Sequence, residues 1–120
     1  MADRMLLISW GQVVRGREMH ATEVFNETLG LYGRMQQDGR IESFDVTLLR
    51  PHGGMEGYIE LHGSAAQIAA VQDDGEFLAM LADAQMIVDD IRTVEGYTGD
   101  QIARMMTIYG EASSKVPQMA

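Results

Sequence analysis

The sequence contains no cysteine, only two prolines and one tryptophan, and a single lysine, Lys115. The absence of cysteine excludes disulfide bonds, zinc–thiolate sites and thiol nucleophiles, so packing must hold the domain together. No apolar run approaches the length of a membrane-spanning helix, and the start of the chain lacks the features of a signal peptide. We therefore expect a cytoplasmic protein.

Positive charge is scarce as well. Nine Lys and Arg residues stand against 18 Asp and Glu residues, which gives a net charge of −9. An acidic surface repels nucleic-acid backbones and anionic lipid headgroups. We therefore expect no nucleic-acid partner and no membrane binding, and the simplest explanation of the acidity is solubility.

The length of 120 residues and the hydrophobic content of 46% are typical of one globular domain with its own core. No linker or low-complexity segment divides the chain. We expect a single domain over residues 1–112 and a frayed C-terminal tail over residues 113–120.

Two segments of alternating apolar and polar residues, 41–49 and 55–62, surround a turn at residues 51–54 and predict a β-hairpin. Their apolar faces match when Val46 lies opposite Ile59. A shift by one residue would mismatch every pair, so the pairing can be predicted from the pattern.

The other elements follow from periodicity and capping signals. We expect a strand over residues 5–14, a helix over 17–35, one broken helix or two short helices over 64–84, a strand over 86–94, and a last helix from residue 98 to about Gly110. This β-α-β-β-α-β order predicts an α+β, ferredoxin-like fold. Its four-stranded antiparallel sheet should carry helices on one face, with one extra C-terminal helix.

In element order, length and turn placement the chain resembles the dimeric α/β-barrel superfamily. The resemblance rests on the opening strand Leu6–Trp10, the hairpin with its turn Pro51–Gly54, and the segment Met86–Val94. It implies a homodimer whose sheets pair face to face, in many members with a small organic ligand between sheet and helices. Relatives include small monooxygenases, haem-handling enzymes, dehydratases and isomerases, alongside members of unassigned function. Since no subfamily motif stands out, the resemblance leaves the chemistry open.

The three histidines are candidates for acid–base chemistry. His62 should lie opposite Ser43, at the far end of the hairpin from His52, roughly 25–30 Å away at about 3.3 Å per residue. The histidines therefore cannot share one metal within a subunit, and we expect neither a metal site nor a cofactor. His20 and His62 are the candidate catalytic residues, although a surface or turn position is the simpler explanation of each histidine.

The polar face of the hairpin should set Asp45 opposite Glu60 and Thr47 opposite Tyr58. Adjacent carboxylates cost stability unless one is protonated or a cation such as Arg92 lies near. Such a pair can do acid–base work. A polar, exposed sheet face or a wet dimer interface is the simpler explanation.

Trp10 shares a strand face with Leu6 and Ile8, which favours a core position, but near a strand end it can also wall a pocket. The candidate ligand-binding residues are Trp10, His52, Tyr58, Glu60 and Arg92. Three functions stay open. They are a cofactor-independent small-molecule enzyme of monooxygenase or isomerase type, a non-catalytic homodimer that binds a ligand or partner, and a dimer whose cleft is filled by its own side chains.

Overall fold

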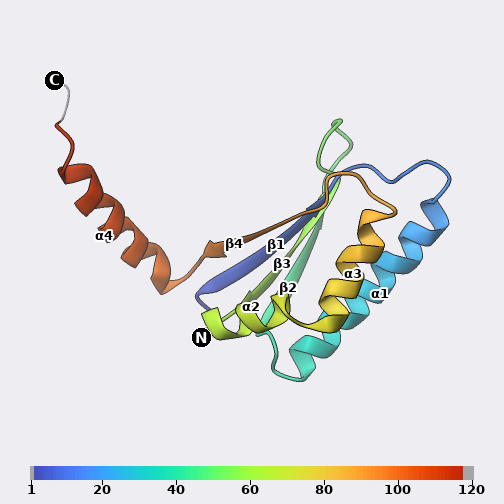
Figure 1. The fold of residues 1–120 in the computed structure, drawn as a ribbon, viewed down its shortest axis with the longest axis horizontal. Helices are drawn as coiled ribbons and strands as arrows, with labels where there is room; N and C mark the ends of the chain where they lie inside the picture. Colours follow the sequence, from blue (N-terminus) through green and yellow to red (C-terminus); the bar gives the residue numbers. More distant parts are fainter. Residues whose placement is uncertain (1, 118–120) are drawn as a thin grey trace.

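The computed structural model describes residues 2–117. A four-stranded antiparallel sheet in the order β2-β3-β1-β4 carries a layer of three helices, α1 to α3, on one face (Figure 1). The elements in chain order are β1 (Arg4–Trp10), α1 (Glu18–Gln37), β2 (Ser43–Leu48), β3 (Gly57–Gly63), α2 (Ala65–Gln72), α3 (Gly75–Gln85), β4 (Arg92–Tyr97) and α4 (Asp100–Ser114). This arrangement confirms the predicted ferredoxin-like, α+β fold.

The two central strands, β1 and β3, hold the core. Leu6 pairs with Leu61 and Ile8 pairs with Ile59, and all four side chains are at most 2% exposed. Val46 on β2 lies opposite Ile59, so the predicted hairpin pairing is confirmed. Because side chains alternate between the faces of a strand, this register sends the apolar residues toward the helices and the polar residues to the open face.

The predicted fourth strand is present but its bounds are wrong, since β4 spans Arg92–Tyr97 and not residues 86–94. The apolar residues before it pack beneath the helices instead of pairing along β1. Ile87 is 3% exposed, and Val88 forms an isolated bridge with Val13. A short run of apolar residues looks the same in the sequence whether it pairs in a sheet or packs as a loop against helices.

The predicted ends of two other elements also differ from the structure. The first strand ends at Trp10 rather than at residue 14, and α4 continues through Gly110 to Ser114. A glycine inside a helix costs only about 1 kcal/mol relative to alanine, so it weakens a helix without ending it. The region over residues 64–84 forms two short helices, and Ser64 and Gln67 make the predicted capping box at the start of α2.

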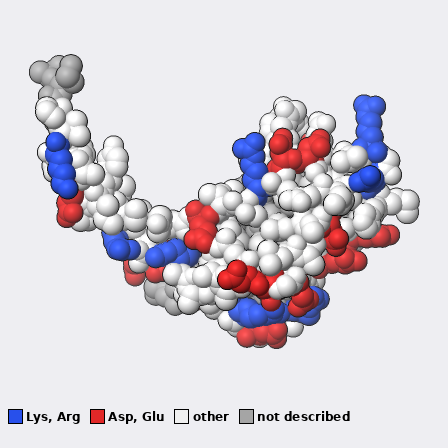
Figure 2. Space-filling model, in the orientation of Figure 1, with Lys and Arg blue, Asp and Glu red and all other residues white. Residues whose placement is uncertain are grey.

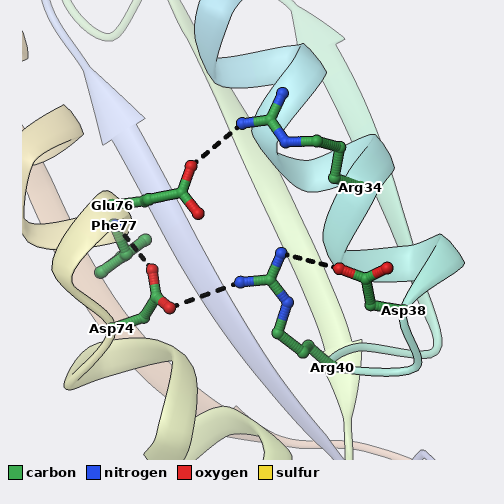
Figure 3. Close-up of polar contacts among 6 residues, drawn as sticks. All are labelled: Arg34, Asp38, Arg40, Asp74, Glu76 and Phe77. Atoms are coloured by element: carbon green, nitrogen blue, oxygen red, sulfur yellow. Dashed lines mark hydrogen bonds and ion pairs between the residues drawn. The ribbon is translucent and has the colours of Figure 1, made fainter.

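Ion pairs join the helix layer at its lower end (Figure 3). Arg34 on α1 donates to Glu76 at 3.1 Å, and Arg40 in the turn after α1 donates to Asp74 at 3.4 Å. Asp74 is also the N-cap of α3 and accepts the backbone N–H of Phe77 at 3.1 Å. The start of α3 is thereby fixed against the end of α1, which sets the spacing of the helices above the sheet.

Within the described residues, no helix is both long enough and apolar enough to cross a membrane.

Tyr32 on α1 is a buried polar residue within the core. Its ring packs edge-on against Phe44 at a centroid distance of 5.9 Å and is 0% exposed. Its hydroxyl has no hydrogen-bond partner among the described residues, and burial raises the pKa of Tyr32 far above its usual range. An unsatisfied buried hydroxyl costs about 1–3 kcal/mol.

Replacing Tyr32 with Phe keeps the ring and removes the buried hydroxyl. We expect the free energy of unfolding to rise by about 1 kcal/mol, as measured by urea denaturation. Tyr97→Phe is the control, because Tyr97 is 51% exposed and should show no gain. A loss of stability in Tyr32→Phe would show that the hydroxyl is satisfied by a bound water.

The raised pKa of Tyr32 also predicts a pH dependence. The unfolded chain loses this proton near pH 10, whereas the folded chain keeps it. Above that pH the unfolded state binds fewer protons, so the free energy of unfolding falls as pH rises. This fall should be smaller in Tyr32→Phe than in the wild type or in Tyr97→Phe, which urea denaturation above pH 10 would measure.

Candidate functional site

A cavity of about 370 Å³ lies between the sheet and the helices α1 and α3. Ile8 and Ile59 form its floor on the sheet, Phe25 lines it from α1, and Ala84 lines it from α3. Val88 closes it from the segment that precedes β4. A cavity of this size can hold a small organic molecule, since ligand pockets start at roughly 300 Å³.

Trp10 stands at one end of this cavity, where β1 ends. Its indole packs edge-on against Phe25 at a centroid distance of 5.9 Å. Gly57 lies opposite Trp10 on β3, and a Cβ atom at Gly57 would come within 2.8 Å of the indole. The glycine therefore leaves the space that lets the indole lie across β3 and wall the cavity.

The lining of the cavity contains few polar groups. The hydroxyls of Thr28 and Thr22 donate to carbonyl oxygens of α1 itself, at 2.7 and 3.1 Å. Among the described lining residues, Glu18 alone is ionisable; its carboxylate accepts the backbone N–H of Gly16 at 2.8 Å, which lowers the pKa of Glu18. The cavity therefore suits a molecule with a largely apolar body.

A second, more polar hollow of about 550 Å³ lies on the other side of Trp10. The hairpin turn contributes Gly53 to its lining, and the segment that enters β4 contributes Asp90 and Arg92. The guanidinium of Arg92 lies 4.0 Å from the carboxylate of Asp90, whose φ of 52° is unusual for a residue other than glycine. Trp10 and Arg92, both predicted as ligand-binding residues, thus lie at the same end of the sheet.

A third cluster lies on the open face of the sheet. His62 Nε2 is 3.2 Å from Asp45 Oδ2 and 3.4 Å from Glu60 Oε2. The cation beside the predicted carboxylate pair is therefore His62 when protonated, whereas Arg92 lies by the polar hollow. The cluster could also hold a divalent cation, because the imidazole nitrogen of His62 and carboxylate oxygens of Asp45 and Glu60 lie within 4.8 Å of one another.

The other predicted site residues lie apart from the cavity. His20 is on the exposed side of α1, and His52 is in the hairpin turn, where its ring is 2.9 Å from the Arg50 carbonyl oxygen. Tyr58 lies on the open face of the sheet with His62, opposite the face that carries the cavity. None of these four aromatic residues lines the cavity.

The cavity residues that the sequence did not reveal come from the segment before β4. Ile87, Val88 and Ile91 all line the cavity, together with Val13 just beyond β1. Their apolar character is visible in the sequence, but it equally fits a strand. Only the contact between two chain segments that are far apart in sequence identifies them as a wall.

Comparisons with known proteins give a likeness of structure alone. No family model matches this chain, and no curated protein matches it.

Solved structures do match. A dimeric protein of unknown function with a ferredoxin-like fold from Bacteroides fragilis superposes with a TM-score of 0.60 at 10% identity, covering 79% of this chain and 96% of its own. A protein of unknown function from Nitrosomonas europaea superposes with a TM-score of 0.60 at 13% identity, covering 82% of this chain and 90% of its own. SnoaB, a cofactor-independent oxygenase from Streptomyces nogalater, superposes with a TM-score of 0.57 at 12% identity, covering 81% of this chain and 92% of its own. At these identities the likeness shows the fold alone, and this chain has a ferredoxin-like fold.

Proposed function

We propose that this protein binds a small, largely apolar organic molecule in the cavity beside Trp10. The observation that carries the proposal is the cavity itself, about 370 Å³ of space with a largely apolar lining that opens at the edge of the sheet beside Leu48. Concave, largely apolar pockets of this size are the usual form of small-molecule sites. A small apolar molecule would cover side chains that are otherwise in contact with water, which favours its binding.

We further propose that the bound molecule is the substrate of a cofactor-independent reaction of monooxygenase or isomerase type. The cofactor-independent oxygenase among the structural neighbours supports this class of reaction. With its lowered pKa, Glu18 is a weak base, and it is the sole ionisable group among the described lining residues. The substrate must therefore ionise readily by itself, as a phenol or an enol does.

The second candidate is a non-catalytic binding protein. The observation in its favour is the position of the histidines, since His20 and His62 both lie outside the cavity. The enzyme and the non-catalytic binding protein would both bind the molecule, but only the enzyme would convert it to a product.

The active form in this proposal is a homodimer. The helices α1 to α3 cover one face of the sheet, and the opposite face carries half-buried and exposed apolar side chains, such as Leu7 and its neighbour Val94. A dimeric neighbour with the same fold supports this assembly.

Filling the cavity should abolish binding. Ala84 is 7% exposed and lines the cavity, so Ala84→Leu places extra carbon atoms inside it. We expect the affinity for phenyl-naphthylamine, an uncharged apolar fluorescent dye, to fall by at least about tenfold, equivalent to 1.4 kcal/mol. Because Trp10 is the only tryptophan, quenching of its emission reports directly on the cavity.

Ala82→Leu is the matched control, since Ala82 lies on the same helix, is exposed and does not line the cavity. It should bind the dye like the wild type, and urea denaturation should show both variants folded. Equal dye binding by all three proteins would place the dye elsewhere and refute the binding site.

Turnover can be tested with a hydroxynaphthalene, an electron-rich phenol of suitable size. Oxidation to the quinone consumes one O₂ and releases one water, so an oxygen electrode measures the rate directly. We expect uptake above the uncatalysed rate for the wild type and Ala82→Leu, and the uncatalysed rate for Ala84→Leu. Dye binding without uptake would favour the non-catalytic candidate.

A further inference from the structure

Three side chains of metal-ligating type converge on the open face of the sheet. They are Asp45 on β2 and Glu60 and His62 on β3. Asp45 lies directly opposite Glu60 in the strand pairing, and His62 follows Glu60 by two residues, so all three side chains point to the same face. The described part of the chain holds one such group of three.

Acidic residues alone do not identify this site. Figure 2 shows Asp and Glu side chains spread over the drawn face of the molecule, in several places beside Lys or Arg, without forming one acidic patch. The cluster differs from these residues because an imidazole nitrogen lies beside two carboxylates. Nitrogen and oxygen donors together suit divalent first-row transition ions, whereas Mg²⁺ and Ca²⁺ prefer oxygen ligands alone.

The distances between the donor atoms fit a bound ion. His62 Nε2 lies 3.2 Å from Asp45 Oδ2 and 3.4 Å from Glu60 Oε2. Two ligand atoms of a tetrahedral Zn²⁺ lie about 3.3–3.5 Å apart, because each is about 2.0–2.2 Å from the metal. The imidazole nitrogen therefore lies close to the separation from each carboxylate that a shared ion requires.

A proton on the imidazole cannot satisfy both carboxylates. Nε2 carries at most one proton, and its hydrogen bond goes to Asp45 at 3.2 Å, which leaves Glu60 without a donor from this nitrogen. Within residues 2–117, no Lys or Arg side chain forms an ion pair with Asp45 or Glu60. Like charges directly opposite each other in a sheet are destabilising. With a neutral imidazole, the form that binds metals, the two carboxylates carry two negative charges, which one divalent cation balances.

The sheet holds the three donors in place. The side chains of His62 and Glu60 are 20% and 32% exposed, so their neighbours limit their movement, whereas Asp45 on the outer strand β2 is 74% exposed and leaves the ion a path from water. Sites built on strands are more precise than sites on loops. Three protein ligands also leave at least one coordination position for water, as in zinc sites that stay open to solvent.

We propose that Asp45, Glu60 and His62 bind a divalent first-row transition ion such as Zn²⁺. The prediction of no metal site considered the three histidines and the absence of cysteine, but not one histidine combined with two carboxylates. The ion joins the outer strand β2 to β3, so its binding stabilises this edge of the sheet. The site is independent of the cavity, because the sheet lies between them.

The first test is a titration of the untagged full chain with Co²⁺, whose visible absorption strengthens when protein ligands replace its octahedral water shell. The chain has no cysteine and only three histidines, so few other groups compete for the ion. We expect saturation at one ion per chain, displacement by Zn²⁺ and no displacement by Mg²⁺. His62→Gln and Asp45→Asn should each weaken binding by at least about 100-fold, since even changes outside the ligands cost about 10–100-fold.

His20→Gln is the matched control. His20 is exposed on α1 and lies 3.5 Å from a single carboxylate, that of Glu23, so its loss should leave the affinity for Co²⁺ unchanged. Wild-type affinity in both His62→Gln and Asp45→Asn would place the ion elsewhere and overturn the proposal. No saturable binding by the wild type would show that the cluster shares only a proton, and displacement by equal Mg²⁺ would remove the role of the imidazole.

The second test measures stability. An ion that binds the folded chain in preference to the unfolded chain raises the free energy of unfolding. We expect Zn²⁺ to raise the urea midpoint of the wild type and of His20→Gln, and to leave that of Asp45→Asn unchanged. Asparagine at this exposed position should leave the fold intact, which the midpoint without Zn²⁺ checks. A rise of equal size in Asp45→Asn would contradict the bridge between β2 and β3.

Discussion

The alternation of side chains along β1 and β3 is the constraint on which the rest of this structure depends. These strands form the middle of the sheet, and their pairing puts Leu6, Ile8, Ile59 and Leu61 together on one face. A shift of one residue would turn these four side chains away from the helices. The floor of the cavity and the core are therefore specified by the same register.

That register also separates two kinds of chemistry. The apolar cavity lies on the helix side of the sheet, whereas His62, Asp45 and Glu60 meet on the open side. A molecule in the cavity cannot reach this cluster, since the sheet lies between them. In the proposed function, chemistry in the cavity therefore depends on shape, exclusion of water and the substrate's own acidity, whereas the cluster lies on the open face of the sheet and takes no part in it.

The sequence predicted the hairpin well because both of its strands carry the same two-residue pattern, and Val46 can match Ile59 in only one register. It could not place residues 86–91, because an apolar run is consistent with a strand and with a packed loop. It predicted the amphipathic helix at the C-terminus but not that this helix leaves the body of the molecule, since periodicity defines a face and not its partner. The cluster at His62 was missed because it joins diagonal neighbours, whereas the prediction considered directly opposite pairs.

The cavity reaches solvent at one residue of the outer strand β2. Leu48 lines the cavity and is nevertheless 68% exposed, so the cavity reaches the edge of the sheet at β2. A binding site for an apolar molecule that opens to water at an edge strand would lose much of the benefit of desolvating its ligand. Leu48 therefore sets how much of a bound molecule stays in contact with water, because a molecule that covers its side chain removes apolar surface of both from solvent and binds more tightly as a result.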